Sequence, residues 1–226
     1  MRTAGIEGRR RARAASLAGL YAVTPDLADT AQLVRAVEAA LAGGARAIQY
    51  RNKNADSTLA HAQAAALAQV HVARGGLYIV NDDPALAAAV DADGVHLGED
   101  DGAIAEARER IGPERIIGVS CYDRLELAEA AVAAGADYVA FGSFHASPVK
   151  PRARRADVSL LARARSLGVP VVAIGGITAE NARALFAAGA DAVAVISAVF
   201  DGAGPRDVEQ AARAIDSAYR AARAGG

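Results

Sequence analysis

The sequence predicts an α/β fold, a single-domain (β/α)8 TIM barrel, and three observations lead to that prediction. The chain has 226 residues, which suits one domain with a sizeable core. From Leu20 onward, short apolar runs of strand character alternate with longer alanine-rich stretches of helical period. Eight strand–helix units can be counted along the chain, and eight parallel strands with crossover helices close into a barrel.

The elements follow one another in strict alternation from the first strand onward. The strands are expected at Leu20–Val23, Ala47–Arg51, Leu77–Val80, Gly94–Leu97, Ile116–Ser120, Tyr138–Phe141, Val171–Ile174 and Ala192–Ile196. The helices are expected at Thr30–Ala42, Thr58–Arg74, Pro84–Ala89, Ala103–Ile111, Leu125–Ala134, Val158–Leu167, Ala179–Ala188 and Asp207–Ala222. An open doubly wound sheet is the competing architecture. That fold places a glycine fingerprint after the first strand, where this chain has Thr24-Pro25-Asp26.

The charge balance and the cysteine content limit the classes of partner. The chain has 25 basic and 26 acidic residues, and its formal net charge of −1 gives no overall field that would attract nucleic acid. No stretch approaches the roughly 20 apolar residues of a membrane-spanning helix. The single cysteine, Cys121, cannot form an internal disulfide, so a cytoplasmic protein is expected. Small-molecule substrates are the expected partners, without nucleic acid or membrane, and a homo-oligomer is compatible with the sequence.

The first 18 residues differ in composition from the rest of the chain. They hold Arg2, Arg9, Arg10, Arg11 and Arg13 among glycines and alanines, without the apolar core of a signal peptide. Such a segment is typical of a solvated, flexible extension, with contact to RNA or anionic lipid as the alternative. We therefore expect residues 1–18 to be an extension and residues 19–226 to form the barrel catalytic domain.

Cationic residues follow the second expected strand. Lys53 and Lys150 are the only lysines in a chain that otherwise uses arginine, and the two residue types are not equivalent donors. Gln49, Arg51 and Lys53 are spaced two residues apart, so in an extended chain they share one face. A guanidinium fork beside a mobile ammonium suits a phosphate-rich substrate, whereas the alternative interpretation is a solvated strand end.

Acidic clusters follow the third and fourth expected strands, as Asn81-Asp82-Asp83 and Glu99-Asp100-Asp101. One interpretation is helix capping, because an aspartate directly before Pro84 satisfies free amides of the following helix. The other is a Mg²⁺ site, since this ion takes one or two carboxylates and completes its shell with water and phosphate oxygens. Both hold if Asp83 caps the helix while Asp82 faces the mouth of the barrel.

Three further loops carry polar residues or glycines. The longest is 142–151, which contains His145 and Lys150, and long loops in compact domains often bind ligands. Gly175 and Gly176 follow the seventh strand, and Ser197 follows the eighth. In barrels these last two loops commonly form a phosphate site.

Five segments read together resemble the thiamine phosphate synthase family, and the similarity runs from about Leu20 to Phe200. The segments are Tyr21-Ala22-Val23-Thr24-Pro25, Gln49-Tyr50-Arg51-Asn52-Lys53, Asn81-Asp82-Asp83, Gly94-Val95-His96-Leu97-Gly98-Glu99-Asp100-Asp101 and Ala173-Ile174-Gly175-Gly176-Ile177. The resemblance implies a Mg²⁺-dependent transferase. Such an enzyme condenses hydroxymethylpyrimidine diphosphate with thiazole phosphate to give thiamine phosphate and pyrophosphate.

The resemblance also implies a role for each matching position. The diphosphate would be held by Gln49, Arg51, Lys53, Asn81 and Lys150, of which Arg51, Lys53 and Lys150 would be catalytic. Mg²⁺ would be held by Asp82 and Asp101, with Asp100 as the alternative ligand. Ser120 would approach the pyrimidine. The thiazole phosphate would be bound by Ser147, Gly175, Gly176, Ile196 and Ser197.

The chain departs from the family pattern at three positions. The loop after the sixth strand has Val149 where the family usually has a hydroxyl residue and His145 where it has an aromatic one, and Glu99 stands where glutamine is common.

The implied reaction is dissociative: pyrophosphate leaves a stabilised pyrimidine cation, which the thiazole nitrogen attacks. The rivals are a thiazole tautomerase-like paralogue and a non-catalytic phosphate-binding barrel.

Overall fold

The computed structural model describes residues 2–99, 101–146, 155–202 and 204–225. Its eight strands form one closed barrel in sequence order, and every neighbouring pair is parallel. The strands are β1 (Gly19–Val23), β2 (Ala47–Tyr50), β3 (Leu77–Asn81), β4 (Gly94–Leu97), β5 (Ile116–Tyr122), β6 (Tyr138–Phe141), β7 (Val171–Ile174) and β8 (Ala192–Val195). The predicted (β/α)8 barrel is confirmed, with strand ends within two residues of the predicted ones.

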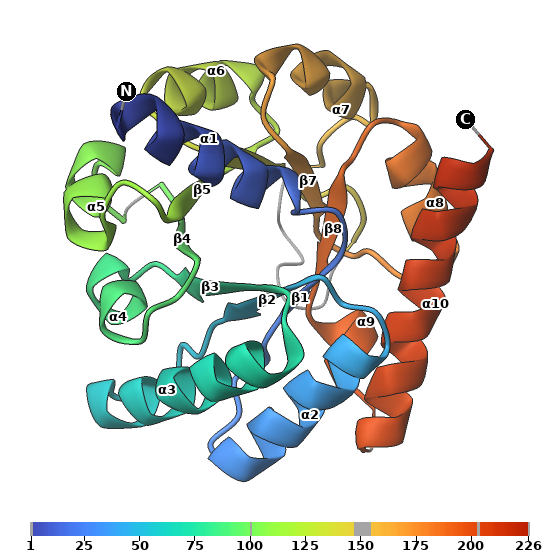
Figure 1. The fold of residues 1–226 in the computed structure, drawn as a ribbon. Coiled ribbons are helices and arrows are strands. Elements are labelled where there is room, and N and C mark those ends of the chain that lie inside the picture. The colour runs from blue at the N-terminus through green and yellow to red at the C-terminus, as the bar shows by residue number, and fades with distance from the viewer. Residues whose placement is uncertain (1, 100, 147–154, 203, 226) are drawn as a thin grey trace.

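Helices surround the strands, as Figure 1 shows in a view along the barrel. The helices are α1 (Arg2–Ala15), α2 (Thr30–Ala42), α3 (Ser57–Arg74), α4 (Pro84–Ala89), α5 (Ile104–Ile111), α6 (Leu125–Ala133), α7 (Ser159–Ala164), η1 (Arg165–Leu167), α8 (Ala179–Ala187), α9 (Ser197–Phe200) and α10 (Pro205–Ala224). Aspartates begin three of them, since Asp29, Asp56 and Asp83 each accept a backbone amide of the first turn. None of these described helices has a stretch long and apolar enough to cross a bilayer.

Two apolar clusters stabilise the barrel. The larger lies between the strands and the surrounding helices, and it includes strand residues such as Val95 and helix residues such as Leu67. The smaller fills the barrel interior, and it includes Tyr21, Ile79 and Tyr138. Side chains therefore occupy the middle of the barrel, as in other barrels of this size, and the ends of the strands are left for binding.

Helix α1 differs from the solvated extension that the arginine content predicts. It lies across the barrel end at which the strands begin (Figure 1), and Ala14 joins the interior cluster together with Leu17, just after the helix. Arg10 Nε lies 2.8 Å from a carboxylate oxygen of the buried Asp137, before β6. The segment is ordered because Ala14 and Leu17 cover the barrel end. In addition, carboxylates of the barrel, Asp137 among them, form ion pairs with its arginines. The boundary between residues 18 and 19 stays a prediction.

Candidate functional site

The candidate site is the rim at which the strands end. Because all eight strands are parallel, their carboxyl ends share one side of the molecule, and barrel enzymes place their active sites there. The described candidate residues all lie at or just beyond these ends. They are Gln49 in β2 with Arg51 and Lys53 after it, Asn81 in β3 with Asp82 after it, Asp101 after β4, Ser120 in β5, Gly175 and Gly176 after β7, and Ile196 and Ser197 after β8.

The spacing of Gln49, Arg51 and Lys53, which we call the cationic row, predicts that all three lie in one extended strand, but the structure differs. Strand β2 stops at Tyr50, so Arg51 and Lys53 lie in the loop. Asp26 organises this loop, since its carboxylate accepts from the Arg51 guanidinium at 3.0 Å and from the Lys53 backbone amide at 2.8 Å. The Thr24 hydroxyl and the Arg51 backbone exchange two hydrogen bonds of 2.8 Å. Thr24 and Asp26 therefore position the cations, and sequence reasoning assigned neither of them this role.

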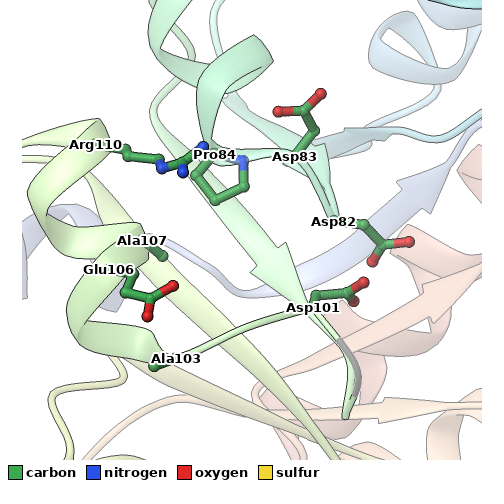
Figure 2. Close-up of a pocket in the computed structure, with 8 residues that line it drawn as sticks. All are labelled: Asp82, Asp83, Pro84, Asp101, Ala103, Glu106, Ala107 and Arg110. Atoms are coloured by element: carbon green, nitrogen blue, oxygen red, sulfur yellow. The ribbon is translucent and has the colours of Figure 1, made fainter.

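The two aspartates after β3, Asp82 and Asp83, have different surroundings. Asp83 accepts from the amides of Ala85 and Leu86 at 2.9 Å each and caps α4. Asp82 has a positive φ of 62°, which is uncommon for a non-glycine residue and is often found at functional sites. Figure 2 shows the Asp82 carboxylate pointing toward that of Asp101 and away from the helix cap. The predicted separation of a capping aspartate from a mouth-facing one describes this arrangement.

Asp82 and Asp101 form a carboxylate pair, and its electrostatics are unusual. Burial, reinforced by the hydrogen bond and the negative charge of Asp101, raises the pKa of Asp82 to about 6. The positive charge of Lys53 opposes this rise in pKa, which places the β2 cation and the β3 carboxylate in one electrostatic neighbourhood. Asp101 is itself oriented by the Gly98 amide, which donates to it at 2.6 Å.

The chemistry of this pair fits a hard divalent cation. Two carboxylates that face each other disfavour joint ionisation unless a positive charge lies between them, and two carboxylate ligands are a usual number for Mg²⁺. Within the described residues, no group of three or more histidine, cysteine, aspartate or glutamate side chains could form a complete metal cage. A metal held by Asp82 and Asp101 would therefore take its remaining ligands from water and substrate. Asp100 lies outside the described residues.

A hollow of about 370 Å³ opens beside the carboxylate pair, between the starts of α4 and α5. Its lining comprises Asp82, Asp83, Pro84, Asp101, Ala103, Glu106, Ala107 and Arg110 (Figure 2). The pair thus has open space on its outer side. Glu99 is engaged elsewhere, in an exposed ion pair with Arg124 at 3.4 Å.

Gln49 and Ser120 are joined through the barrel interior. Gln49 is buried and donates to the Tyr21 hydroxyl, while Ser120 lies 2.9 Å from Nε2 of His96. Tyr138 links Tyr21 to His96. Sequence reasoning missed these three connecting residues, although His96 is a buried polar residue in one of the segments that carried the family resemblance.

The loops after β6 and β7 pack closely on each other. Gly175 and Gly176 have positive φ angles of 101° and 63°, and a Cβ on either would lie within 2.3 Å of atoms in the loop after β6. The His145 amide donates to the Gly175 carbonyl at 3.0 Å. These glycines are therefore required by loop packing as well as by the expected approach of a phosphate. Ile196 precedes and Ser197 begins the short α9 after β8.

Besides Asp100, three positions named in the sequence analysis lie outside the described residues, namely Ser147, Val149 and Lys150. The expected roles of Ser147 toward the thiazole phosphate and of Lys150 toward the diphosphate stay predictions. His145 is described, and its backbone carbonyl accepts from the Ser143 hydroxyl at 2.7 Å.

Known proteins resemble this chain over nearly its whole length. The model of the thiamine monophosphate synthase family matches residues 20–199. A thiamine-phosphate synthase of Methylobacillus flagellatus is 57% identical over 195 residues, covering 86% of this chain and 92% of the relative. One from Chromobacterium violaceum is 56% identical, covering 87% and 94%. The structure of a thiamine phosphate pyrophosphorylase from Pyrococcus furiosus superposes with a TM-score of 0.79 at 37% identity, covering 93% of this chain and 98% of the other. On this sequence and structural similarity, the chain belongs to the thiamine monophosphate synthase family.

Proposed function

We propose that the chain is a thiamine-phosphate synthase that requires Mg²⁺. The reaction joins the methylene carbon of hydroxymethylpyrimidine diphosphate to the nitrogen of thiazole phosphate. The carbon–oxygen bond to the diphosphate breaks, a carbon–nitrogen bond forms, and pyrophosphate is released. The observation that carries the proposal is the facing pair of Asp82 and Asp101 carboxylates (Figure 2), which lies within the electrostatic influence of Lys53, because these groups suit a metal-bound diphosphate between them.

The residues of the chain would act mainly by electrostatics. Arg51, Lys53 and Lys150 would neutralise the charge that builds on the departing oxygens, which is the class of contribution that often dominates such reactions. Mg²⁺, when bound, would supply further charge neutralisation on the diphosphate. Gln49 and Asn81 would help hold the diphosphate. Ser120 would face the pyrimidine, and the glycine pair with Ser147, Ile196 and Ser197 would bind the thiazole phosphate.

The rival functions fit the rim less well. A thiazole tautomerase-like paralogue moves a proton without a diphosphate or a metal, and it needs neither the Asp82–Asp101 pair nor the complete cationic row. A non-catalytic phosphate-binding barrel gives no reason for the positive φ of Asp82. The relatives named thiamine-phosphate synthase, at more than half identity, also favour the synthase.

The test is a reaction with the two purified phosphorylated heterocycles, followed by release of pyrophosphate. With Mg²⁺ present, we expect pyrophosphate and thiamine phosphate in equal amounts, and excess EDTA should abolish both. Readdition of Mg²⁺ should restore activity, which separates metal loss from unfolding. Tautomerisation of the thiazole carboxylate phosphate without pyrophosphate release would instead favour the paralogue.

The compartment and the assembly state are also proposals. Cys121 is a free, buried thiol, which is compatible with work in the cytoplasm. Fractionation of cells that express the full chain would test the compartment, and light scattering would test for a homo-oligomer.

A further inference from the structure

A chain of five polar side chains crosses the barrel interior beneath the candidate site. The Gln49 amide donates to the Tyr21 hydroxyl at 2.7 Å, and the Tyr21 and Tyr138 hydroxyls lie 2.9 Å apart. Nδ1 of His96 lies 3.0 Å from the Tyr138 hydroxyl, and its Nε2 lies 2.9 Å from Ser120 Oγ. We call these five residues the interior chain; they come from five different strands.

The interior chain is unusual for the middle of a barrel, which branched aliphatic side chains normally fill. Tyr21 and Tyr138 are at most 1% exposed, and His96 is 8% exposed. Buried polar groups destabilise the fold unless each is paired, so such a network carries a requirement for complete hydrogen bonding. Its two ends, Gln49 and Ser120, are the positions for which a substrate contact is expected.

The pairing of neighbouring strands leaves space for the interior chain. Gly118 of β5 pairs directly with Tyr138 of β6, and a Cβ at position 118 would lie 1.9 Å from the Tyr138 ring. The glycine therefore leaves the space in which this ring lies against β5. The Tyr138 ring also contacts Tyr21 edge-on, with centroids 6.3 Å apart, and His96 at 5.5 Å. Packing thus fixes the rings that carry the central hydrogen bonds.

Complete pairing of the buried protons gives the hydrogen bonds of the chain one direction. Each tyrosine hydroxyl has one proton to donate. Tyr21 accepts from Gln49, and among the described residues its own proton has the Tyr138 hydroxyl within reach. If no buried proton is left unpaired, Tyr21 donates to Tyr138, and Tyr138 donates to Nδ1 of His96. Because Nδ1 accepts this hydrogen bond, the proton of the neutral imidazole ring is on the other nitrogen, which lies 2.9 Å from Ser120 Oγ. That proton is on Nε2 and is donated to Ser120.

Ser120 therefore accepts from inside the barrel and keeps its own proton for the substrate side. Ser120 is half-buried in β5. A hydroxyl held in this way can donate to an unprotonated aromatic ring nitrogen, whereas a ring N–H in the same place would leave the Ser120 proton without that acceptor. An aminopyrimidine presents ring nitrogens that are acceptors, whereas the corresponding pyrimidinone carries a ring N–H.

We propose that Tyr21, Tyr138 and His96 are positioning residues that hold Ser120 as a hydrogen-bond donor and so select an aminopyrimidine over a pyrimidinone. The inference rests on the proposed function, because it concerns the pyrimidine half of that reaction. It assigns a role to three side chains that lie below the rim.

The first experiment compares Tyr138→Phe and His96→Gln with Tyr78→Phe. Tyr78 is the matched control, because its buried hydroxyl donates to the Ala64 carbonyl at 2.9 Å on the outer side of the barrel. Tyr138→Phe should raise the KM of the pyrimidine diphosphate about tenfold and change that of the thiazole phosphate less than about twofold, as expected for one weakened hydrogen bond. His96→Gln keeps a donor toward Ser120 and should show a smaller rise.

The same variants test the selectivity directly. Hydroxymethylpyrimidine monophosphate and its 4-oxo counterpart serve as competitive inhibitors. We expect the wild-type chain to bind the amino form more tightly, and Tyr138→Phe to reduce this preference about tenfold. Equal losses for both substrates, unchanged selectivity, or the same losses in Tyr78→Phe would overturn the proposal.

The second experiment is independent of activity. In ¹⁵N-histidine spectra of the wild-type chain without substrate, the His96 signals, assigned by their loss in His96→Gln, should show a protonated Nε2 and a bare Nδ1. A proton on Nδ1 would reverse the direction of the chain and overturn the proposal. If the wild-type chain made no thiamine phosphate, the proposed function would be wrong, and these spectra would still decide the direction of the chain.

Discussion

The two ends of the barrel use charge in opposite ways. At the end where strands begin, Asp137 is buried between Arg10 and Arg108, with closest contacts of 2.8 and 2.6 Å, and it also accepts the Ile117 amide. At the other end, Asp82 and Asp101 face each other as like charges. A fold is destabilised when one partner of a compensated buried charge is removed, whereas closely placed like charges raise the energy of the empty site. From this difference we expect that changes at the first end affect mainly stability and changes at the second affect mainly the proposed binding.

The largest effect is expected from breaking the carboxylate pair. Asp82→Asn should lower kcat/KM for the pyrimidine diphosphate by about 100-fold or more, since it removes charge that the proposed metal site needs. Asp83→Asn is the control, because the Asp83 carboxylate caps α4 and asparagine also caps helices well. Steady-state kinetics at several Mg²⁺ concentrations would measure both variants. Equal losses at the two positions would contradict the assignment.

At the end of the barrel where the strands begin, we expect a substitution to lower stability and to leave activity nearly unchanged. Asp137→Asn leaves Arg10 and Arg108 with an uncharged partner, so we expect the free energy of unfolding to fall by about 3 kcal/mol. Activity at a temperature where the variant stays folded should change little. Denaturant titration measures the stability. A fall in activity as large as that of Asp82→Asn, at unchanged stability, would remove the distinction between the two ends.

A smaller loss is expected where α1 covers the barrel. Leu17 is 1% exposed and lies in the interior cluster, so Leu17→Ala should lower the free energy of unfolding by about 2 to 3 kcal/mol through lost packing. Arg11 and Glu7 are the comparison, because they form an exposed pair on the same helix, and Arg11→Ala should have no measurable effect. Thermal unfolding would compare the two. Similar melting temperatures for both variants would show that α1 does not cover the interior in solution.

Local signals explain why the barrel could be predicted. Alternating apolar runs and alanine-rich stretches mark strands and helices within a few residues of sequence. The different roles of Asp82 and Asp83 were also readable, since an aspartate before Pro84 is a local capping signal. The residues at the end of β2 were only partly predicted. Gln49, Arg51 and Lys53 lie at one rim, but Asp26, more than 20 residues earlier, holds the loop.

Long-range partners explain what the sequence did not reveal. The arginines of α1 resemble a solvated run until Asp137, more than 120 residues later, is placed beside Arg10. The interior chain is equally non-local, because the pairing of Gly118 with Tyr138 depends on strand register. Composition and spacing do not reveal such contacts, because the residues that make them are distant in sequence and become neighbours only in the folded barrel.

The backbone at Asp82 has an evolutionary consequence. A φ of 62° is the conformation that glycine adopts without steric penalty, whereas other residues tolerate it at an expense of about 1 kcal/mol. Random drift toward glycine at this codon would therefore relax the main chain while deleting a carboxylate. Persistence of aspartate here would mean that selection acts on chemistry against a local conformational preference.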